Sequence, residues 1–279
     1  MTGVTGSVGS SDSASTRSWL APRTLLVPAV VGLLFLLLPL AALVARVQWT
    51  TFWHDITSPQ ALSALALSLG TGAAATGLCL VLGVPLAILI ARSRSRAAAA
   101  MRALVTIPLV LPPMVGGVAL LYLFGRNGWI GGPLAEAGIP LPFTTPAVVM
   151  AQTFVALPFL VLAVEGALRT TGTAFEETAA GLGASRWTIL RRVTLPLAAP
   201  GLVAGVVLSF ARAIGEFGAT ALFAGNAPGV TQTMPLAIYT AFNGAGVAPS
   251  TAVALSVLLL ATALIVLVLV RGWRAGGVR

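Results

Sequence analysis

Six long apolar runs dominate this sequence and limit what the chain can fold into. They cover approximately residues 25–44, 62–90, 104–124, 147–168, 199–222 and 252–270. A helix needs roughly 20 mostly apolar residues to cross a hydrocarbon core about 30 Å thick. Only 8% of the 279 residues are charged, whereas soluble domains carry roughly 25%. We therefore expect an all-α polytopic membrane protein with six transmembrane helices.

The few charged residues exclude most other function classes. All 16 basic residues are arginine, so the chain lacks the lysine of a nucleotide-binding GxxxxGK[ST] loop. The single histidine, His54, and the single cysteine, Cys79, allow no disulfide, no histidine-based triad and no clustered metal ligands. We therefore expect no catalytic residue, no metal site and no cofactor bound by this chain.

The arginine positions predict the orientation of the six spans, because positive charge in short loops stays on the cytoplasmic side. With both termini in the cytoplasm, only Arg46 and Arg126 lie outside, and Arg212 lies within the fifth span. The other thirteen are then cytoplasmic: Arg17, Arg23, Arg92, Arg94, Arg96, Arg102, Arg169, Arg186, Arg191, Arg192, Arg271, Arg274 and Arg279. Topology thus explains the net charge of +9 without a nucleic-acid partner.

The first residues differ in composition from the rest of the chain. Residues 1–18 are rich in Ser, Thr and Gly and contain no apolar run. Such tracts do not bury enough apolar surface to fold. We therefore predict a disordered cytoplasmic tail at 1–18 and a single transmembrane domain over 19–279.

Glycine and proline mark two of the runs for close packing or bending. The second run contains four glycines, which favour close approach of neighbouring helices: Gly70, Gly72, Gly77 and Gly83. The third run contains Pro108 and the pair Pro112-Pro113, which leave carbonyl groups without their helical partners. We expect a kinked third helix, either beside a transport pathway or as an ordinary packing kink.

The loop at 171–196, called the elbow below, carries the start and stop signals of a first short helix. Thr173 is followed three residues later by Glu176, the spacing of a capping box in which each side chain bonds to the other's backbone. Gly183 suits the left-handed residue that ends a helix. The pattern predicts a helix that begins after Thr173 and ends before Gly183.

A second short helix is predicted in the same loop. Ser185 can cap it, and Pro196 is expected to prevent it from running unbroken into the fifth span. The resulting elbow is amphipathic. Two interpretations remain open, namely a surface that docks into a partner protein and a helix that lies on the membrane surface.

The elbow resembles the EAA motif of ABC-importer permeases. That motif has Glu-Ala-Ala, a Gly four residues later and a Pro thirteen residues after the Gly, here Glu177-Thr178-Ala179, Gly183 and Pro196. Thr178 departs from the usual Ala. The resemblance implies that the elbow is the coupling-helix loop, and that its ATPase-coupling residues are Glu176, Glu177, Ala179, Gly183 and Pro196.

A second region resembles the molybdate-type ModB family. It comprises the segments Gly-Glu-Phe-Gly-Ala-Thr at 215–220, Phe-Ala-Gly-Asn at 223–226 and Thr-Gln-Thr-Met-Pro-Leu-Ala-Ile-Tyr at 231–239. Sulfate and thiosulfate permeases share Glu-Phe-Gly and Ala-Gly-Asn but diverge in the third segment. The resemblance therefore favours molybdate as the substrate, and tungstate, sulfate and thiosulfate remain alternatives.

The resemblance implies a type I ABC-importer permease in the cell membrane, working by alternating access. Two copies of the chain, a homodimer, would form one pore. Two separate ATPase subunits would hydrolyse ATP with Mg, and a periplasmic or lipid-anchored binding protein would deliver the oxyanion. This agrees with the missing phosphate-binding loop.

Arg212, Glu216 and Thr220 are the candidate residues of the translocation pathway. Residues four apart share one face of a helix, and ionisable groups at membrane depth usually face an interior or a cavity. Arg212 could attract an anion while Glu216 positions it. The alternative is a purely structural ion pair.

Two other function classes remain as alternatives. A gradient-driven secondary transporter would be expected to show inverted repeats and several intramembrane carboxylates, whereas Glu216 is nearly alone. A membrane-bound enzyme is disfavoured because no nucleophile–base pair is visible.

Overall fold

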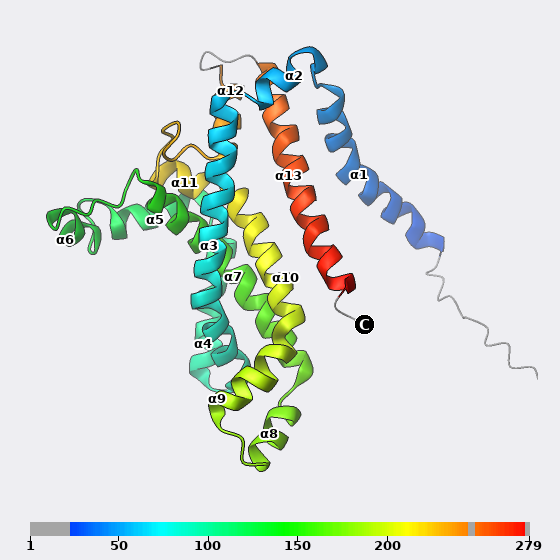
Figure 1. Cartoon of the computed structure of the whole chain (residues 1–279), viewed down its shortest axis with the longest axis vertical. Coiled ribbons are helices and arrows are strands. Elements are labelled where there is room, and N and C mark those ends of the chain that lie inside the picture. Colours follow the sequence, from blue (N-terminus) through cyan, green and yellow to red (C-terminus); the bar gives the residue numbers. More distant parts are fainter. Residues whose placement is uncertain (1–22, 245–248, 277–279) are drawn as a thin grey trace, which may run out of the picture. The chain divides into compact units, whose positions relative to one another are not determined.

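The computed structural model describes residues 23–244 and 249–276, and all regular structure in those ranges is helical (Figure 1). The predicted tail at 1–18 lies outside the described residues. In chain order the helices are η1 (Arg23–Leu25), α1 (Leu26–Ala45), α2 (Trp49–Ile56), α3 (Pro59–Arg92), α4 (Arg96–Val110), α5 (Pro113–Phe124), α6 (Gly131–Glu136), α7 (Thr145–Thr171), α8 (Ala174–Gly181), α9 (Arg186–Ile189), η2 (Leu190–Thr194), α10 (Leu195–Ile214), α11 (Gly218–Phe223), α12 (Met234–Phe242) and α13 (Pro249–Gly276).

Five of these helical stretches are long and apolar enough to cross a membrane: α1, α3, α7, the continuous stretch Arg186–Ile214 and Pro249–Val266 of α13. The pair α4 and α5 raises the number to six if it counts as one broken span. The all-helical membrane class predicted from the sequence is confirmed. The cytoplasmic location of both termini stays a prediction.

The chain divides into two units, which are described separately. The first ends at Ala45 and consists of η1 and α1. None of the residues of α1 is buried, and apolar side chains cover all sides of it. A helix that is hydrophobic all round needs an apolar surrounding, which for α1 is the lipid bilayer.

The centre of the second unit is a bundle of three helices. The middle helix, α7, packs along both α3 and α10 (Figure 1). Small residues let the helix backbones approach closely. A Cβ atom added at Gly83 of α3 would lie 2.8 Å from Leu160, and one at Gly201 of α10 would lie 2.7 Å from the carbonyl oxygen of Ala163. Close glycine contacts thus hold the bundle together.

The second run was predicted to pack closely through four glycines, and two of them do so. Gly72 faces Ile214 and Phe210 of α10, and Gly83 faces Leu160 of α7. Gly70 and Gly77 have no neighbouring atom within reach of an added Cβ.

The third predicted span is not one continuous helix. The helices α4 and α5 meet at an angle of 114°. The cause is the Pro112-Pro113 pair, because a residue before proline is forced out of the helical region. Leu111 has ψ 134° and Pro112 has ψ 134°, and Pro113 then begins α5. The expected kink is therefore a full break.

The fifth predicted span, 199–222, is also wrong in its bounds. Its helix α10 runs from Leu195 to Ile214, and α11 is a separate helix that begins at Gly218. Glu216 and Phe217 lie in the non-helical link. Arg212 and Glu216 therefore do not share one helix, although the sequence spacing predicted this.

We expect Gly201→Ala and Gly70→Ala to change stability in opposite directions. Alanine stabilises an open helix position by up to about 1 kcal/mol, and Gly70 is open. At Gly201 the new methyl group overlaps Ala163 and Ala167, and such overpacking costs about 1–3 kcal/mol. Thermal unfolding of the purified protein in detergent measures both. Equal stability of the two variants would contradict the close α7–α10 approach.

Candidate functional site

The elbow joins α7 to α10 and contains α8, α9 and η2 (Figure 1). Its first helix ends as predicted. Gly183 has φ +82°, its N–H donates to Ala180 O at 2.9 Å, and the N–H of Ala184 donates to Ala179 O at 3.0 Å. These two bonds form a Schellman motif. Gly183 and Ala179 thus set the turn of the elbow.

The start of the second helix is also confirmed. The side chain of Ser185 accepts a hydrogen bond from the N–H of Thr188 at 3.2 Å. This bond satisfies one of the donors that the first turn of a helix leaves unpaired.

The predicted capping box of the first helix does not form. Thr173 is the residue before α8, but its hydroxyl donates to Glu177 Oε1 at 2.6 Å and caps no backbone N–H. The carboxylate of Glu176 points to Arg92 instead. A charge-assisted pair is stronger than a bond to a neutral backbone group, so the carboxylate of Glu176 binds Arg92 rather than the backbone N–H of Thr173.

The predicted break at Pro196 does not occur. The helical course continues from α9 through η2 into α10. Pro196 lies in the first turn of α10, and η2 before it is a π turn in which the N–H of Leu195 donates to Leu190 O. A π turn inserts an extra residue and so relieves the clash between the proline ring and the carbonyl four residues earlier.

Glu176 binds two parts of the protein at once. Its Oε2 lies 2.9 Å from Nε of Arg92, and its Oε1 accepts from Nη2 of Arg92 at 2.9 Å. The hydroxyl of Thr194 donates to the same Oε1 at 2.6 Å. Both charged side chains are largely buried, at 16% exposed for Glu176 and 18% for Arg92. This residue of the elbow therefore faces the interior of the chain.

A second buried carboxylate, that of Glu165, lies on α7. Glu165 pairs with Arg102 of α4 and with Nε of Arg169, the latter at 2.7 Å. Arg169 also donates to Ile90 O at 3.2 Å, and Arg92 donates to Leu168 O at 2.9 Å. The ends of α3 and α7 thus cap each other's carbonyls, as arginines near helix ends do.

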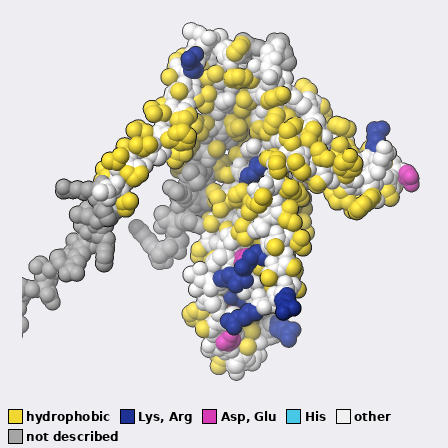
Figure 2. Space-filling view, turned by 180° about the vertical axis from the view of Figure 1, so that it is seen from behind, with side chains coloured by type: hydrophobic (Ala, Val, Ile, Leu, Met, Phe, Trp, Pro, Cys, Tyr) yellow, Lys and Arg dark blue, Asp and Glu magenta, His cyan; other side chains and the backbone are white. Residues whose placement is uncertain are grey.

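The outward side of the elbow is different in character. Glu177 is exposed and bonds only within α8's first turn. Three large apolar side chains are exposed around it, Phe175, Leu182 and Trp187, and Arg191 lies over the Trp187 ring at 5.8 Å. In Figure 2 basic side chains gather at this end of the molecule, below a broad apolar surface. An exposed surface of this kind suits docking to another protein.

The three candidate pathway residues lie at the break between α10 and α11. Nη2 of Arg212 is 2.7 Å from Glu216 Oε2, and Glu216 Oε1 accepts from the N–H of Ala219 at 2.8 Å. Glu216 is 1% exposed, while the Arg212 side chain is 26% exposed. Thr220 is fully buried, and its hydroxyl has no hydrogen-bond partner among the described residues. The structure pairs Arg212 with Glu216, and the Thr220 hydroxyl forms no hydrogen bond with either of them.

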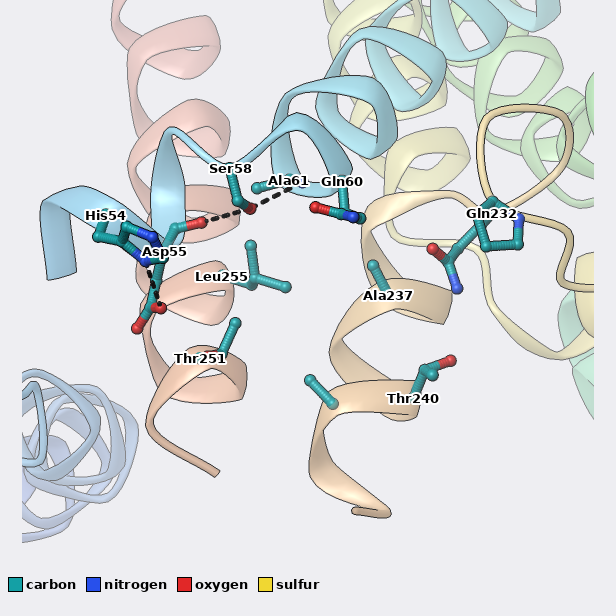
Figure 3. A pocket seen from close by; sticks show the side chains of 12 residues that line it. His54, Asp55, Ser58, Gln60, Ala61, Gln232, Ala237, Thr240, Thr251 and Leu255 are labelled. Atoms are coloured by element: carbon teal, nitrogen blue, oxygen red, sulfur yellow. Dashed lines mark hydrogen bonds and ion pairs between the residues drawn. The ribbon is translucent and has the colours of Figure 1, made fainter. Parts of the chain in front are cut away.

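Sequence reasoning missed a cavity of about 340 Å³ at the N-terminal end of α3 (Figure 3). It is lined by residues of α2, α3, α12 and α13 and of the segment before α12, and its surface is mostly apolar. Its polar lining residues include His54, Asp55, Gln60, Gln232, Thr240 and Thr251. Asp55 Oδ1 lies 3.7 Å from Nδ1 of His54. The signal available in the sequence was the pair His54-Asp55, which joins the chain's single histidine to one of its two aspartates.

Comparison with known proteins identifies the family. The profile described as binding-protein-dependent transport system inner membrane component matches residues 83–271, which is more than half of the chain. The chain belongs to this family. The match includes α7, the elbow and α10 to α12.

Relatives with this family's architecture are similar over most of their length. The molybdenum transport system permease protein ModB of Mycobacterium tuberculosis is 53% identical over 88% of this chain and 92% of its own. The sulfate transport system permease protein CysT of Escherichia coli is 37% identical over 74% of this chain and 76% of its own. The resemblance to ModB-type permeases drawn from the sequence motifs is confirmed.

Solved structures show the same fold. A bacterial ABC transporter that imports the acidic polysaccharide alginate matches with a TM-score of 0.70, 19% identity and coverage of 92% of this chain and 96% of that chain. The methionine ABC transporter MetNI matches with a TM-score of 0.59, 21% identity and coverage of 80% of this chain and 100% of that chain.

We expect Gly183→Ala to loosen the elbow, because a left-handed residue with a side chain costs about 1 kcal/mol. An added Cβ meets no atom at Gly183 or at Gly181, and only Gly183 has positive φ. Backbone hydrogen exchange across 174–189 is therefore expected to rise about fivefold in Gly183→Ala and to stay unchanged or fall in Gly181→Ala. Equal exchange in both variants would show that the left-handed turn does not limit the opening of the elbow.

Proposed function

We propose that this chain is the membrane-spanning permease subunit of an ATP-binding-cassette importer for molybdate. The observation that carries the proposal is the elbow, a capped helix pair with an EAA pattern, in a chain 53% identical to molybdenum permeases. The permease forms the pore, and ATP is hydrolysed with Mg in another polypeptide. This sequence has no lysine and therefore no GxxxxGK[ST] phosphate-binding loop, which supports ATP hydrolysis by a separate subunit.

The assembly we propose contains two copies of this chain, two ATPase subunits and a periplasmic or lipid-anchored oxyanion-binding protein. Each copy crosses the cell membrane six times, with α4 and α5 together as one broken span. Both termini then lie in the cytoplasm, on the side of the arginine-rich elbow. The arginine distribution along the sequence supports this orientation.

Transport proceeds by alternating access in this proposal. Closure of the ATPase subunits around ATP moves the elbow, and the elbow moves the spans joined to it. The exposed apolar side chains of the elbow and Glu177 form the docking surface. Carboxylates pair strongly with arginine, so an arginine of the ATPase is the expected partner of Glu177.

The oxyanion passes the break between α10 and α11 in this proposal. Arg212 supplies the only basic side chain on α10, and Glu216 holds it in place. A pore must not bind its substrate tightly, because the substrate has to leave. Selection among molybdate, tungstate and sulfate therefore rests mainly with the binding protein. The higher identity to the molybdenum permease than to the sulfate permease favours molybdate.

Glu177→Lys is expected to reduce copurification of the ATPase at least about tenfold, since it replaces an attractive charge with a repulsive one. The matched control is Glu136→Lys on α6, another exposed glutamate far along the chain from the elbow. Pull-down of the detergent-solubilised complex measures the effect. Wild-type recovery of the ATPase with Glu177→Lys would exclude Glu177 from the docking surface.

Arg212→Gln is expected to slow molybdate uptake into proteoliposomes about tenfold. This single change also leaves Glu216 buried without its partner, which destabilises the protein. The double variant Arg212→Gln/Glu216→Gln removes both charges and restores stability. If Arg212 guides the anion, uptake stays slow in the double variant. Full recovery of uptake would assign the pair a structural role only.

A further inference from the structure

The two adjacent glutamates of α8 have opposite surroundings. Successive residues of a helix point about 100° apart, so one of the two faces inward. The side chain of Glu176 is 16% exposed. It accepts hydrogen bonds from Nη2 of Arg92 and from the hydroxyl of Thr194, and its Oε2 forms an ion pair with Nε of Arg92. Glu177 is exposed and bonds only to Thr173. Glu176 is therefore unavailable to a partner that docks on the outer surface.

The contacts of Glu176 link the elbow to the far ends of two long helices. Arg92 is the last residue of α3, and Thr194 ends η2, which continues directly into α10. Arg92 engages the carboxylate with two nitrogens. A paired contact of this kind fixes orientation as well as distance, so α8 cannot rotate or shift without moving Arg92.

The backbone on both sides of α8 transmits movement poorly. Gly172 before α8 has φ +67° and Gly183 after it has φ +82°. An added Cβ at either glycine meets no neighbouring atom, so no other element packs against these two positions. The turn at Gly183 is held by its own local hydrogen bonds, and glycine permits many backbone conformations. The side-chain contacts of Glu176 are thus the stiff connection from α8 to the bundle.

The end of α3 is in turn fixed to α7 and α4. Arg92 donates to Leu168 O, Arg169 donates to Ile90 O, and Glu165 joins Arg169 to Arg102 of α4. A displacement of Arg92 therefore moves the ends of three helices together rather than one side chain.

We propose that Glu176, Arg92 and Thr194 are positioning residues that transmit movement of the elbow to α3, α7 and α10. This internal link makes no contact with the ATPase. The inference rests on the proposed function, in which the elbow is moved by the ATPase. It separates two roles within one motif: Glu177 docks, and Glu176 converts docking into movement of the spans.

The test uses the complete importer, with its ATPase and binding protein, in proteoliposomes. Molybdate uptake and ATP hydrolysis are measured in parallel, and their ratio reports coupling. Glu176→Gln keeps the shape of the side chain but removes the charge that holds Arg92. We expect the uptake per ATP to fall about fivefold, while the ATPase still copurifies.

The matched control is Glu177→Gln, the same change on the neighbouring residue. It is expected to weaken copurification of the ATPase while leaving uptake per ATP unchanged in the complexes that remain. The proposed function fails if the wild-type complex carries no molybdate. The link alone fails if the wild-type complex transports and Glu176→Gln has a wild-type ratio.

Two further variants separate coupling from folding. Thr194→Val removes one donor and keeps the shape, and we expect a smaller loss of coupling, about twofold. The double variant Arg92→Glu/Glu176→Arg restores opposite charges, and we expect it to regain coupling relative to either single charge reversal. A double variant as uncoupled as both single reversals, at unchanged thermal stability, would overturn the proposal.

Discussion

Hydrocarbon provides no hydrogen-bond partner, and this constraint determines where the chain is helical and where its charges lie. Backbone groups at membrane depth must be satisfied within helices or by protein. The bundle of α3, α7 and α10 meets this condition by close helix packing at glycines such as Gly83 and Gly201. Where the helices break, side chains can satisfy the freed backbone groups. At the α10–α11 break, for example, the carboxylate of Glu216 accepts the N–H of Ala219.

Some of the arginines used to predict the topology also form ion pairs and hydrogen bonds at the elbow end of the bundle. Arg92, Arg102 and Arg169 each pair with a glutamate, and two of them also cap a helix carbonyl. A long arginine side chain can satisfy several acceptors at once, because its planar fork carries five N–H donors. The small number of carboxylates therefore suffices to join α3, α4, α7 and the elbow. Charge distribution along the sequence predicts the side of the membrane but not these partners.

Local signals in the sequence were sufficient where the interaction is itself local. The left-handed turn at Gly183 and the cap at Ser185 depend on residues within the same turn, so both could be predicted. The capping box of Thr173 and Glu176 could not, because Arg92, 84 positions away, competes for the carboxylate. Composition likewise does not show that the helices end at Leu111 and Gly215, because the apolar runs continue across both sites. The cavity beside Asp55 depends on four helices that meet only in the folded chain.

The positions of the polar features along α3 and α10 favour a transporter over a static membrane protein. The helix α3 spans 34 residues, about 50 Å at 1.5 Å per residue. One end borders the cavity beside Asp55, and the other holds the Arg92–Glu176 link to the elbow. The buried pair Arg212–Glu216 lies at a helix break on α10, in the same unit. Buried ion pairs contribute little net stability compared with apolar packing, and ionisable groups at membrane depth are costly. This chain keeps an ion pair where its backbone is irregular, and it has a second set of ion pairs at the elbow end of the bundle. Such an arrangement suits a transporter in which movement at the elbow end changes a pathway elsewhere in the same unit.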